Sequence, residues 1–376
     1  MLKVGYICET DITDIHVWSG TIANLNKIIK QKYKTIPIVP NSKVIKLYNS
    51  LIKISNKLGL NRISKKFKIK LSKEYANYID LYVNKNDVDI LFAPAASNLV
   101  AFINTNIPLI YLSDATFNLM NGYYWNSLSS YEIQYGNMFE KDALENATDI
   151  IYSSNWAKKD AISFYKINRD KIYVLPFGAN LPDKYVESKF NEKIVNLLFV
   201  GVDWERKGMD TALETVSYLN NNSNGKKYVL NVIGLEKPEN KTFENVIFHG
   251  FVSKNDSNGL KKIIDLYNLS NIFIFPTRAE CSAIVLSEAA EYSLPVVTYD
   301  TGGLSSYVIN NDNGYRLNLE SNYVDFANVI IKITSSQAEY EKFSKNARKL
   351  FENELNWSIW LEKFSDIVEN AVKENK

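Results

Sequence analysis

The chain has 376 residues, of which 46% are hydrophobic and 23% are charged, and its formal net charge at pH 7 is +2. This profile is that of a folded soluble protein with two domains or one large one. The two cysteines, Cys8 and Cys281, exclude a disulfide scaffold and fit a reducing compartment. No apolar run reaches the length of about 18 residues that a membrane-spanning helix needs.

The charge is spread unevenly, because every charged residue from Lys27 to Lys73 is basic. Within this stretch, apolar residues recur at helical spacing among lysines: Val44, Leu47, Leu51, Ile54 and Leu58. A basic amphipathic helix of this kind can lie on an anionic membrane surface. We therefore interpret residues 27–73 as a surface for an anionic membrane. A core-packing helix with a solvated lysine face is the alternative.

The first half of the chain alternates short apolar runs with longer amphipathic or polar stretches. The runs predict strands at Lys3–Cys8, Val88–Ala95, Ile107–Asp114 and Ala147–Ser154, and a further run at Lys171–Leu181 closes this half. A polar-aromatic loop is expected at residues 115–125, and a helix from Trp156. Strands separated by segments of helix length indicate right-handed βαβ units and a parallel sheet.

The same pattern restarts in the second half. Strands are predicted at Val195–Gly201, Lys227–Gly234, Asn245–Val252, Asn271–Thr277 and Leu294–Asp300. Helices are predicted at Met209–Asn220, Leu260–Ser270, Ala283–Ser293 and Asn356–Lys376. This is a second α/β sheet, and the polar segment Leu181–Asn191 is the expected boundary. In two doubly wound domains that face a cleft, ligands bind at the carboxyl ends of the strands.

Charged and glycine residues follow three of the strands in the second half. Arg206 and Lys207 precede Gly208 at the start of a helix, where free N–H groups favour an anion. Glu280 follows the next strand, and Glu288 lies in the helix after it. The turn Gly302–Gly303 follows a third strand and allows close backbone approach to a ligand. A diphosphate attached to polyol groups would be complementary to this set.

These residues lie in recognisable motifs. The segment "RAECSAIVLSEAAEYSLPVVTYDTGG" resembles the paired-glutamate motif of retaining glycosyltransferases of family 4, and "FVGVDWERKG" is similar to another motif of that family. "SDATF", "SSNWA", "PFGAN" and "NDNGYRL" resemble the same group, so the resemblance covers roughly residues 19–317. It implies the α/β GT-B fold, in which two Rossmann-like doubly wound domains face a central cleft. The expected parts are an acceptor-binding domain 1–183, a nucleotide-sugar-binding domain 184–355 and a helix 356–376 that crosses back.

The resemblance also implies roles for individual residues. Arg206 and Lys207 would hold the donor diphosphate, Glu280 would bind hydroxyls of the donor sugar, and Glu288 would bind the nucleotide ribose. Together with Asp114, the first three form the expected catalytic set. Further donor contacts are implied for Gly20, Thr21, His249, Phe251, Ser282, Ala283, Ile284, Gly302 and Gly303. "ECSAIV" departs from the aromatic-glycine pair that usually follows the first glutamate, which leaves the donor identity open.

Two first-domain residues keep more than one interpretation. Asp114 ends a strand where many relatives carry a histidine-containing turn, and a helix-capping role is the alternative. His16 lies near the loop that contains Gly20, and we weigh a ligand contact equally with a capping or packing role. Asp87–Asp89 precedes its strand, so we do not expect a metal there, and the "GxSxG" and "GxGxxG" motifs of hydrolases and dehydrogenases are absent.

The sequence thus predicts a retaining, metal-independent glycosyltransferase without a cofactor. Its donor would be a UDP- or GDP-linked sugar, and its acceptor a saccharide or lipid-linked saccharide in the synthesis of a cell-surface polysaccharide or glycolipid. We expect no nucleic-acid partner and a cytoplasmic location, peripheral on the inner face of the plasma membrane. The alternatives are a non-catalytic nucleotide-sugar-binding partner of a glycosylation complex, and a nucleotide-sugar hydrolase or epimerase on the same fold.

Overall fold

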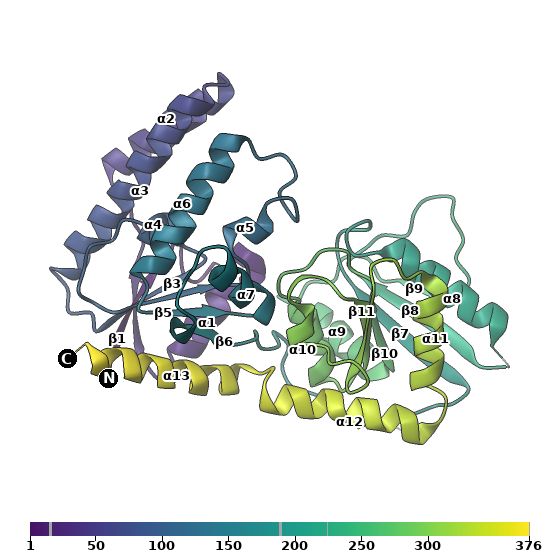
Figure 1. Ribbon diagram of the computed structural model, residues 1–376. Coiled ribbons are helices and arrows are strands. Elements are labelled where there is room, and N and C mark those ends of the chain that lie inside the picture. Colours follow the sequence, from purple (N-terminus) through teal and green to yellow (C-terminus); the bar gives the residue numbers. More distant parts are fainter. Residues whose placement is uncertain (15–16, 188–189, 224, 376) are drawn as a thin grey trace. The chain divides into compact units, whose positions relative to one another are not determined.

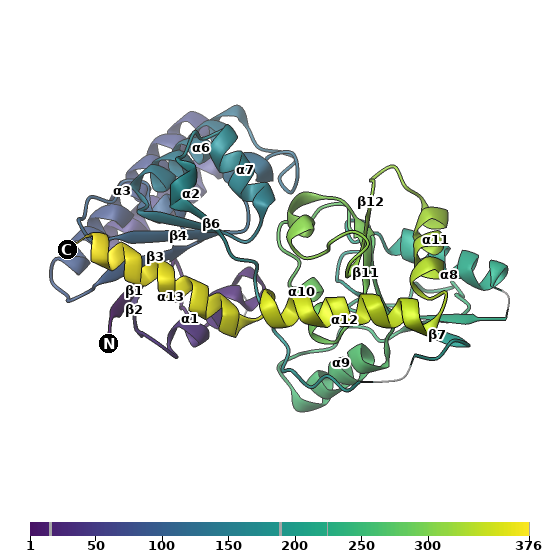
Figure 2. The same ribbon diagram turned by 60° about the horizontal axis from the view of Figure 1, so that its bottom comes forward.

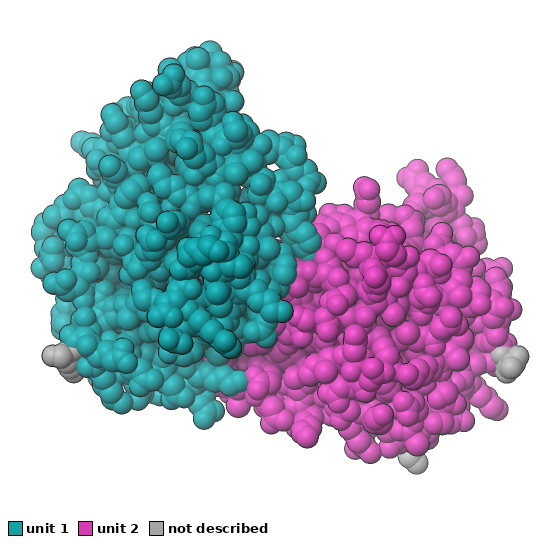
Figure 3. Space-filling view, viewed as in Figure 1, with its two compact units in different colours: residues 1–175, 361–376 teal, residues 176–360 magenta. Residues whose placement is uncertain are grey.

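The computed structural model describes residues 1–376 except 15, 16, 188, 189, 224 and 376 (Figure 1). The chain forms two compact units, coloured separately in Figure 3. Unit 1 comprises Met1–Leu175 and Leu361–Lys376, and unit 2 comprises Pro176–Trp360. The chain therefore passes from one unit to the other at residues 175–176 and returns at 360–361. The predicted boundaries were 183–184 and 355–356.

Unit 1 contains a six-stranded sheet in the order β2-β1-β3-β4-β5-β6, and all neighbouring strands are parallel. The strands are β1 (Lys3–Ile7), β2 (Lys34–Ile38), β3 (Ile90–Pro94), β4 (Leu109–Ser113), β5 (Asp149–Tyr152) and β6 (Ile172–Val174). β3 and β4 are buried along their whole length, which explains why they appear in the sequence as continuous apolar runs.

Helices cover both faces of this sheet. They are α1 (Thr21–Ile29), α2 (Lys43–Lys57), α3 (Asn61–Val83), α4 (Ser97–Val100), α5 (Phe117–Met120), α6 (Ser130–Asn146), α7 (Asn155–Ser163) and α13 (Trp357–Glu374). Alternate strand residues face opposite layers: Leu91 belongs to the apolar cluster formed with α3 and α6, whereas the Phe92 ring contacts Phe364 of α13. Figure 2 views the sheet of unit 1 from the face on which α13 lies.

Unit 2 contains a second parallel sheet in the order β12-β11-β10-β7-β8-β9. The strands are β7 (Ile194–Val200), β8 (Lys227–Ile233), β9 (Val246–Phe248), β10 (Ile272–Phe275), β11 (Val296–Tyr299) and β12 (Gly314–Leu317). The helices are α8 (Met209–Asn222), α9 (Ser257–Leu269), α10 (Ile284–Glu291), α11 (Tyr323–Ile333) and α12 (Gln337–Asn353). Leu197 and Ile274 pack with α8 and α11, and Leu198 and Phe273 pack with α9 and α10, so this sheet is also doubly wound.

The predicted strands are confirmed, but several elements were missed. β2 was not predicted, since Pro37 and the half-buried Thr35 and Ile36 break the apolar pattern at this sheet edge. The segment 115–125, interpreted as a loop, contains the short helix α5. The predicted amphipathic helix is α2. Of the five apolar residues on which that prediction rested, four are exposed: Val44 (43%), Leu47 (57%), Ile54 (56%) and Leu58 (64%), which directly follows the helix. None of the helices in the described part of the chain has the length and hydrophobicity needed to cross a bilayer.

Candidate functional site

The strand order of unit 2 reverses between β7 and β10. From β7 the chain moves to β8 on one side, and β10 lies on the other side. In an open parallel sheet, the loops at the carboxyl ends of two such strands separate and leave a crevice for a ligand. Arg206 and Lys207 lie in the loop after β7, and Glu280 lies in the loop after β10. The predicted cations and the first predicted carboxylate therefore share this switch point.

Both cations contact the same carboxylate oxygen. Lys207 Nζ donates a hydrogen bond to Glu280 Oε2, and Arg206 Nη1 lies 3.5 Å from that oxygen. The Lys207 and Glu280 side chains are only 12% and 11% exposed. Burial lowers the pKa of Lys207, and the nearby Glu280 carboxylate opposes this shift. Lys207 therefore carries its positive charge in a position largely shielded from solvent, and the Glu280 carboxylate stabilises that charge.

Arg206 has further partners that fix its orientation. Its Nε lies 3.3 Å from Asp203 Oδ2, and its Nη1 lies 3.3 Å from the Ala279 carbonyl oxygen. The Arg206 backbone N–H also donates to Asp203 Oδ1 at 3.0 Å, and this bond is the main reason that the pKa of Asp203 is lowered. Asp203 belongs to the "VDWERKG" motif but had been given no role. Its signal was its position three residues before Arg206, where a carboxylate can cap the turn.

Gly208 lets the loop after β7 approach the loop after β10. Its φ is +74°, and a Cβ at this position would lie 2.0 Å from the Pro276 carbonyl oxygen. The Arg278 backbone N–H donates to the Arg206 carbonyl at 2.8 Å, which joins the two loops directly. Glycine is needed here both for its positive φ and for the missing side chain.

The diglycine turn packs against the glutamate loop. Gly302 has φ of +52° and begins a 3₁₀ helix, Gly302–Ser306. The Gly303 N–H donates to the Glu280 carbonyl at 3.2 Å. The Gly303 N–H therefore positions the Glu280 loop.

Ser282, Ala283 and Ile284 lie at the start of α10. Ala283 is the N-cap residue, and its methyl side chain offers no cap to the first turn of this helix. The N-terminal N–H groups of an uncapped helix can serve an anionic or polar ligand. The placement is consistent with the backbone contacts predicted for these three residues.

Glu288 lies inside α10 and is completely buried. Lys254 Nζ donates to its Oε1, and the Tyr267 hydroxyl donates to its Oε2 at 3.1 Å. Neighbouring Glu291 has a pKa raised to about 9 by burial and then by the charge of Glu288, so Glu291 is protonated at neutral pH. Neither Lys254 nor Tyr267 was predicted. Lys254 follows β9, so its position after a strand was the available signal.

His249 and Phe251 follow β9 in the same sheet. His249 Nε2 lies 3.0 Å from Asn231 Oδ1 of β8, and burial followed by the charge of Lys262 lowers the pKa of its imidazole. The Phe251 ring is 74% exposed. The two residues therefore differ: the His249 side chain is hydrogen-bonded within the sheet of unit 2, whereas the Phe251 ring is exposed to solvent.

The remaining predicted residues belong to unit 1. Trp18 Nε1 donates to Asp114 Oδ2 at 3.2 Å, which joins the loop after β4 to the loop after β1. Gly20 has φ of +81° and is the N-cap residue of α1, and Thr21 is only 1% exposed as the first residue of that helix. His16 lies outside the described residues. In the ranges that the structure describes, histidine, cysteine and carboxylate side chains form no group of three suited to a metal ion.

Residues 183–350 match the family model of the glycosyl transferases group 1. We call this matched segment the group 1 domain. The group 1 domain thus lies within unit 2 and contains the Arg206–Lys207–Glu280 cluster together with Glu288.

Curated proteins similar to this chain include glycosyltransferases of capsule and lipopolysaccharide synthesis. The chain is 28% identical over 256 residues to the capsular polysaccharide biosynthesis glycosyltransferase CapM of Staphylococcus aureus, covering 64% of this chain and 66% of CapM. It is 24% identical over 257 residues to the lipopolysaccharide glucosyltransferase WaaG of Escherichia coli (strain K12), covering 61% of this chain and 65% of WaaG. The alignments thus span just under two thirds of each relative.

Solved structures share the fold over both units. A sucrose-phosphate synthase from Thermosynechococcus elongatus covers 98% of this chain, and 99% of its own chain is matched, with a TM-score of 0.66 at 15% identity. The WaaG structure covers 97% of this chain, and 99% of its own chain is matched, with a TM-score of 0.60 at 17% identity. The chain therefore has the GT-B fold expected from its sequence.

Proposed function

We propose that this chain is a retaining glycosyltransferase that moves a sugar from a nucleoside diphosphate to a saccharide or lipid-linked acceptor. The observation that carries the proposal is the cluster of Arg206, Lys207 and Glu280 at the switch point of the group 1 domain. The names of the relatives support a role in the synthesis of a cell-surface polysaccharide or glycolipid.

The cluster matches the charge that such a reaction develops. When the bond between the anomeric carbon and the phosphate oxygen breaks, negative charge grows on the leaving diphosphate. Arg206 and Lys207 would stabilise that charge without a metal, aided by the N–H groups at the start of α10. The donor phosphates would displace Glu280 from the two cations, and its carboxylate would then accept hydrogen bonds from the sugar hydroxyls.

Glu288 would accept hydrogen bonds from the ribose hydroxyls, as its buried and oriented carboxylate suggests. Since that carboxylate is now bonded to Lys254, ribose binding requires Lys254 to move aside. The Lys254 side chain is 37% exposed whereas that of Glu288 is fully buried, so moving Lys254 costs less free energy than moving Glu288.

Retention of the anomeric configuration would follow from attack on the face that the diphosphate leaves. The acceptor oxygen bonds to the anomeric carbon on that face, and its proton passes to the leaving phosphate oxygen. This route uses no side chain as a nucleophile. Isolation of a covalent glycosyl-enzyme would contradict it.

A peripheral position at the inner face of the plasma membrane is part of the proposal, and the surface of α2 supports it. The exposed Leu47 and Ile54 lie on a helix whose charged residues are all lysines. Vesicles with phosphatidylglycerol should bind the protein, and Leu47→Asp with Ile54→Asp should reduce that binding. Leu269→Asp, at an equally exposed leucine of unit 2, is the control. Equal binding to neutral phosphatidylcholine vesicles would contradict the membrane role.

Product analysis by proton NMR tests the activity. Wild-type protein with UDP- or GDP-linked sugars and a saccharide or lipid-linked acceptor should give a product of unchanged anomeric configuration, also in the presence of EDTA. Lys207→Ala should abolish transfer, whereas Lys261→Ala, which removes an exposed lysine–carboxylate pair, should not. Free sugar formed equally well without acceptor would favour the hydrolase, an epimerised donor would favour the epimerase, and donor binding without turnover would favour the binding partner.

A further inference from the structure

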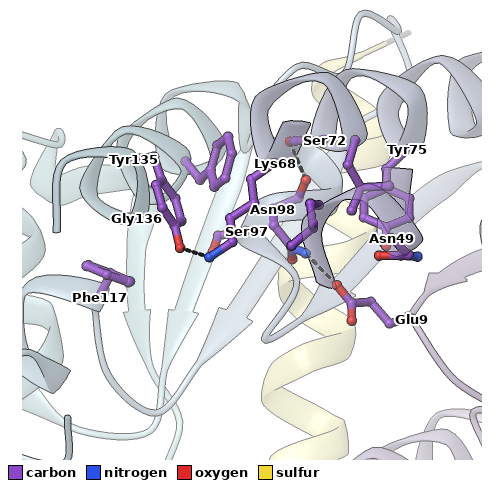
Figure 4. A pocket seen from close by; sticks show the side chains of 13 residues that line it. Glu9, Asn49, Lys68, Ser72, Tyr75, Ser97, Asn98, Phe117, Tyr135 and Gly136 are labelled. Carbon is purple, nitrogen blue, oxygen red and sulfur yellow. Dashed lines mark hydrogen bonds between the residues drawn. The ribbon is translucent and has the colours of Figure 1, made fainter. Parts of the chain in front are cut away.

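Unit 1 contains a pocket of about 350 Å³, a size suited to a small ligand. Residues of helices α2, α3 and α6 line it, and Figure 4 shows the lining side chains from close by. Glu9 follows β1, Ser97 begins α4 after β3, and Phe117 begins α5 after β4. The pocket therefore opens at the carboxyl edge of the sheet, where doubly wound domains bind their ligands.

One wall of the pocket is aromatic, and it requires a glycine that lowers the stability of α6. Gly136 lies in the middle of this helix, where glycine is less favourable than alanine by about 1 kcal/mol. A Cβ at Gly136 would lie 2.0 Å from the Phe117 ring, so the glycine makes room for that ring. Tyr135 and Phe139 extend the same wall, with ring centroids 5.7 Å apart. Flat apolar faces beside polar groups suit the faces of a sugar ring.

A partly buried cation lies beside this wall. Lys68 is 24% exposed, and its Nζ donates to the Tyr135 hydroxyl and lies 4.5 Å from the Tyr135 ring centroid. The Glu132 carboxylate is 3.8 Å away, but it also accepts hydrogen bonds from the Ser129 N–H and hydroxyl in the capping box of α6. Lys68 is therefore less fully neutralised than Lys207, whose Nζ bonds directly to Glu280, and an anion in the pocket would complete its pairing.

The other side of the pocket carries groups that bind hydroxyls. Asn98 Nδ2 donates to the exposed Glu9 carboxylate, and the Ser72 hydroxyl donates to the Asn98 carbonyl. Asn49 and Ser97 also line this side. Glu9 retains accepting capacity for hydroxyl groups, and the amide and hydroxyl side chains can both donate and accept.

We propose that this pocket binds a sugar that carries an anionic group, either a carboxylate or a phosphate. The ring packs against Phe117 and Tyr135, the anion pairs with Lys68, and the hydroxyls bond to Glu9 and Asn98. The proposal rests on the proposed function, since it assigns the pocket to the acceptor of the glycosyl transfer. It narrows the acceptor class to acidic or phosphorylated saccharides.

Calorimetric titration of the full chain tests this with four probes: glucuronate, glucose 1-phosphate, glucose and inorganic phosphate. The two anionic sugars should bind about tenfold more tightly than glucose, because each gains one charge-assisted contact. Lys68→Met should remove that difference, and Lys68→Arg should preserve it. Lys66→Met, at an exposed lysine on the same helix, should leave binding unchanged.

The proposal would be overturned by no binding of either anionic sugar, by equal binding of glucose, or by an unaltered preference in Lys68→Met. Inorganic phosphate bound as tightly as glucose 1-phosphate would also overturn it, since the pocket would then be a simple anion site. The same preparation is titrated with UDP and GDP. Nucleotide binding that depends on Lys207, without binding of acidic sugars, would reject the pocket assignment and leave the proposed function standing. Binding of acidic sugars without nucleotide binding would reject the proposed function and with it the acceptor role, and leave the pocket as a site for acidic sugars.

Discussion

Replacing Glu280 with glutamine should tighten the binding of a nucleoside diphosphate while abolishing sugar transfer. In the structure, Lys207 Nζ and Arg206 Nη1 both contact Glu280 Oε2, so a diphosphate must displace this oxygen before it reaches the cations. Glutamine removes the competing charge and its repulsion of phosphate. It also removes the carboxylate that would hold the donor sugar, so the effects on diphosphate binding and on transfer have opposite signs.

The size of the effect follows from the burial of the pair. With the two side chains 12% and 11% exposed, solvent screens the interaction only partly. Close charge pairs couple by about 1.5 kcal/mol or more, and about 1.4 kcal/mol corresponds to a tenfold change in affinity. We therefore expect Glu280→Gln to bind UDP or GDP about tenfold more tightly than the wild type.

Isothermal titration with UDP and GDP measures this change. Glu205→Gln is the matched control, because it removes the same charge from an exposed position in the neighbouring loop and should change the affinity by less than about twofold. A Glu280→Gln protein that binds the diphosphate as weakly as the wild type, or more weakly, would refute the proposed competition between carboxylate and phosphate.

Three further substitutions test the structure around the sites, each by its thermal unfolding. Burial raises the pKa of the Glu140 carboxyl from 4.5 to about 7. The free energy of unfolding therefore falls by about 3 kcal/mol as the pH rises from 4.5 to 7. The Tm of Glu140→Gln should exceed that of the wild type by more at pH 7 than at pH 4.5. A pH-independent difference would disprove this. Gly208→Ala should lower Tm because of its φ and the contact with Pro276, whereas Gly225→Ala, with positive φ but open space, should lower it less. Lys254→Met should lower Tm by leaving the buried Glu288 without its cation, and adding Glu288→Gln should restore part of the loss; no restoration would count against the pair.

The sequence predicted the central strands and the switch-point residues for the same physical reason. Buried parallel strands are continuous apolar runs, and polar residues that follow them must lie at the carboxyl edge of the sheet. Arg206, Lys207 and Glu280 were therefore expected together, and the structure brings them into contact. The edge strand β2, with Pro37 and only partial burial, lacks this signature and was missed.

Pairings that depend on the direction of a side chain could not be predicted from the sequence. Lys254 reaches Glu288 from a loop 34 residues earlier, and nothing in the spacing distinguishes it from other lysines after strands. The use of the Gly303 N–H by the Glu280 carbonyl depends on the turn that the backbone adopts. Likewise, the apolar stripe of α2 has the same periodicity whether it packs in a core or faces outward, and only the structure shows Leu47 and Ile54 exposed.

The most direct test of the central claim is donor binding by the Lys207 variant. A panel of UDP- and GDP-linked sugars is titrated against the wild type, Lys207→Met and the control Lys261→Met. The account predicts that sugars linked to one of the two nucleotides bind the wild type and the control equally, and that Lys207→Met binds them at least about tenfold more weakly. Wild-type affinity in Lys207→Met, or no binding of any nucleotide sugar to the wild type, would contradict the assignment of this cluster as the donor site.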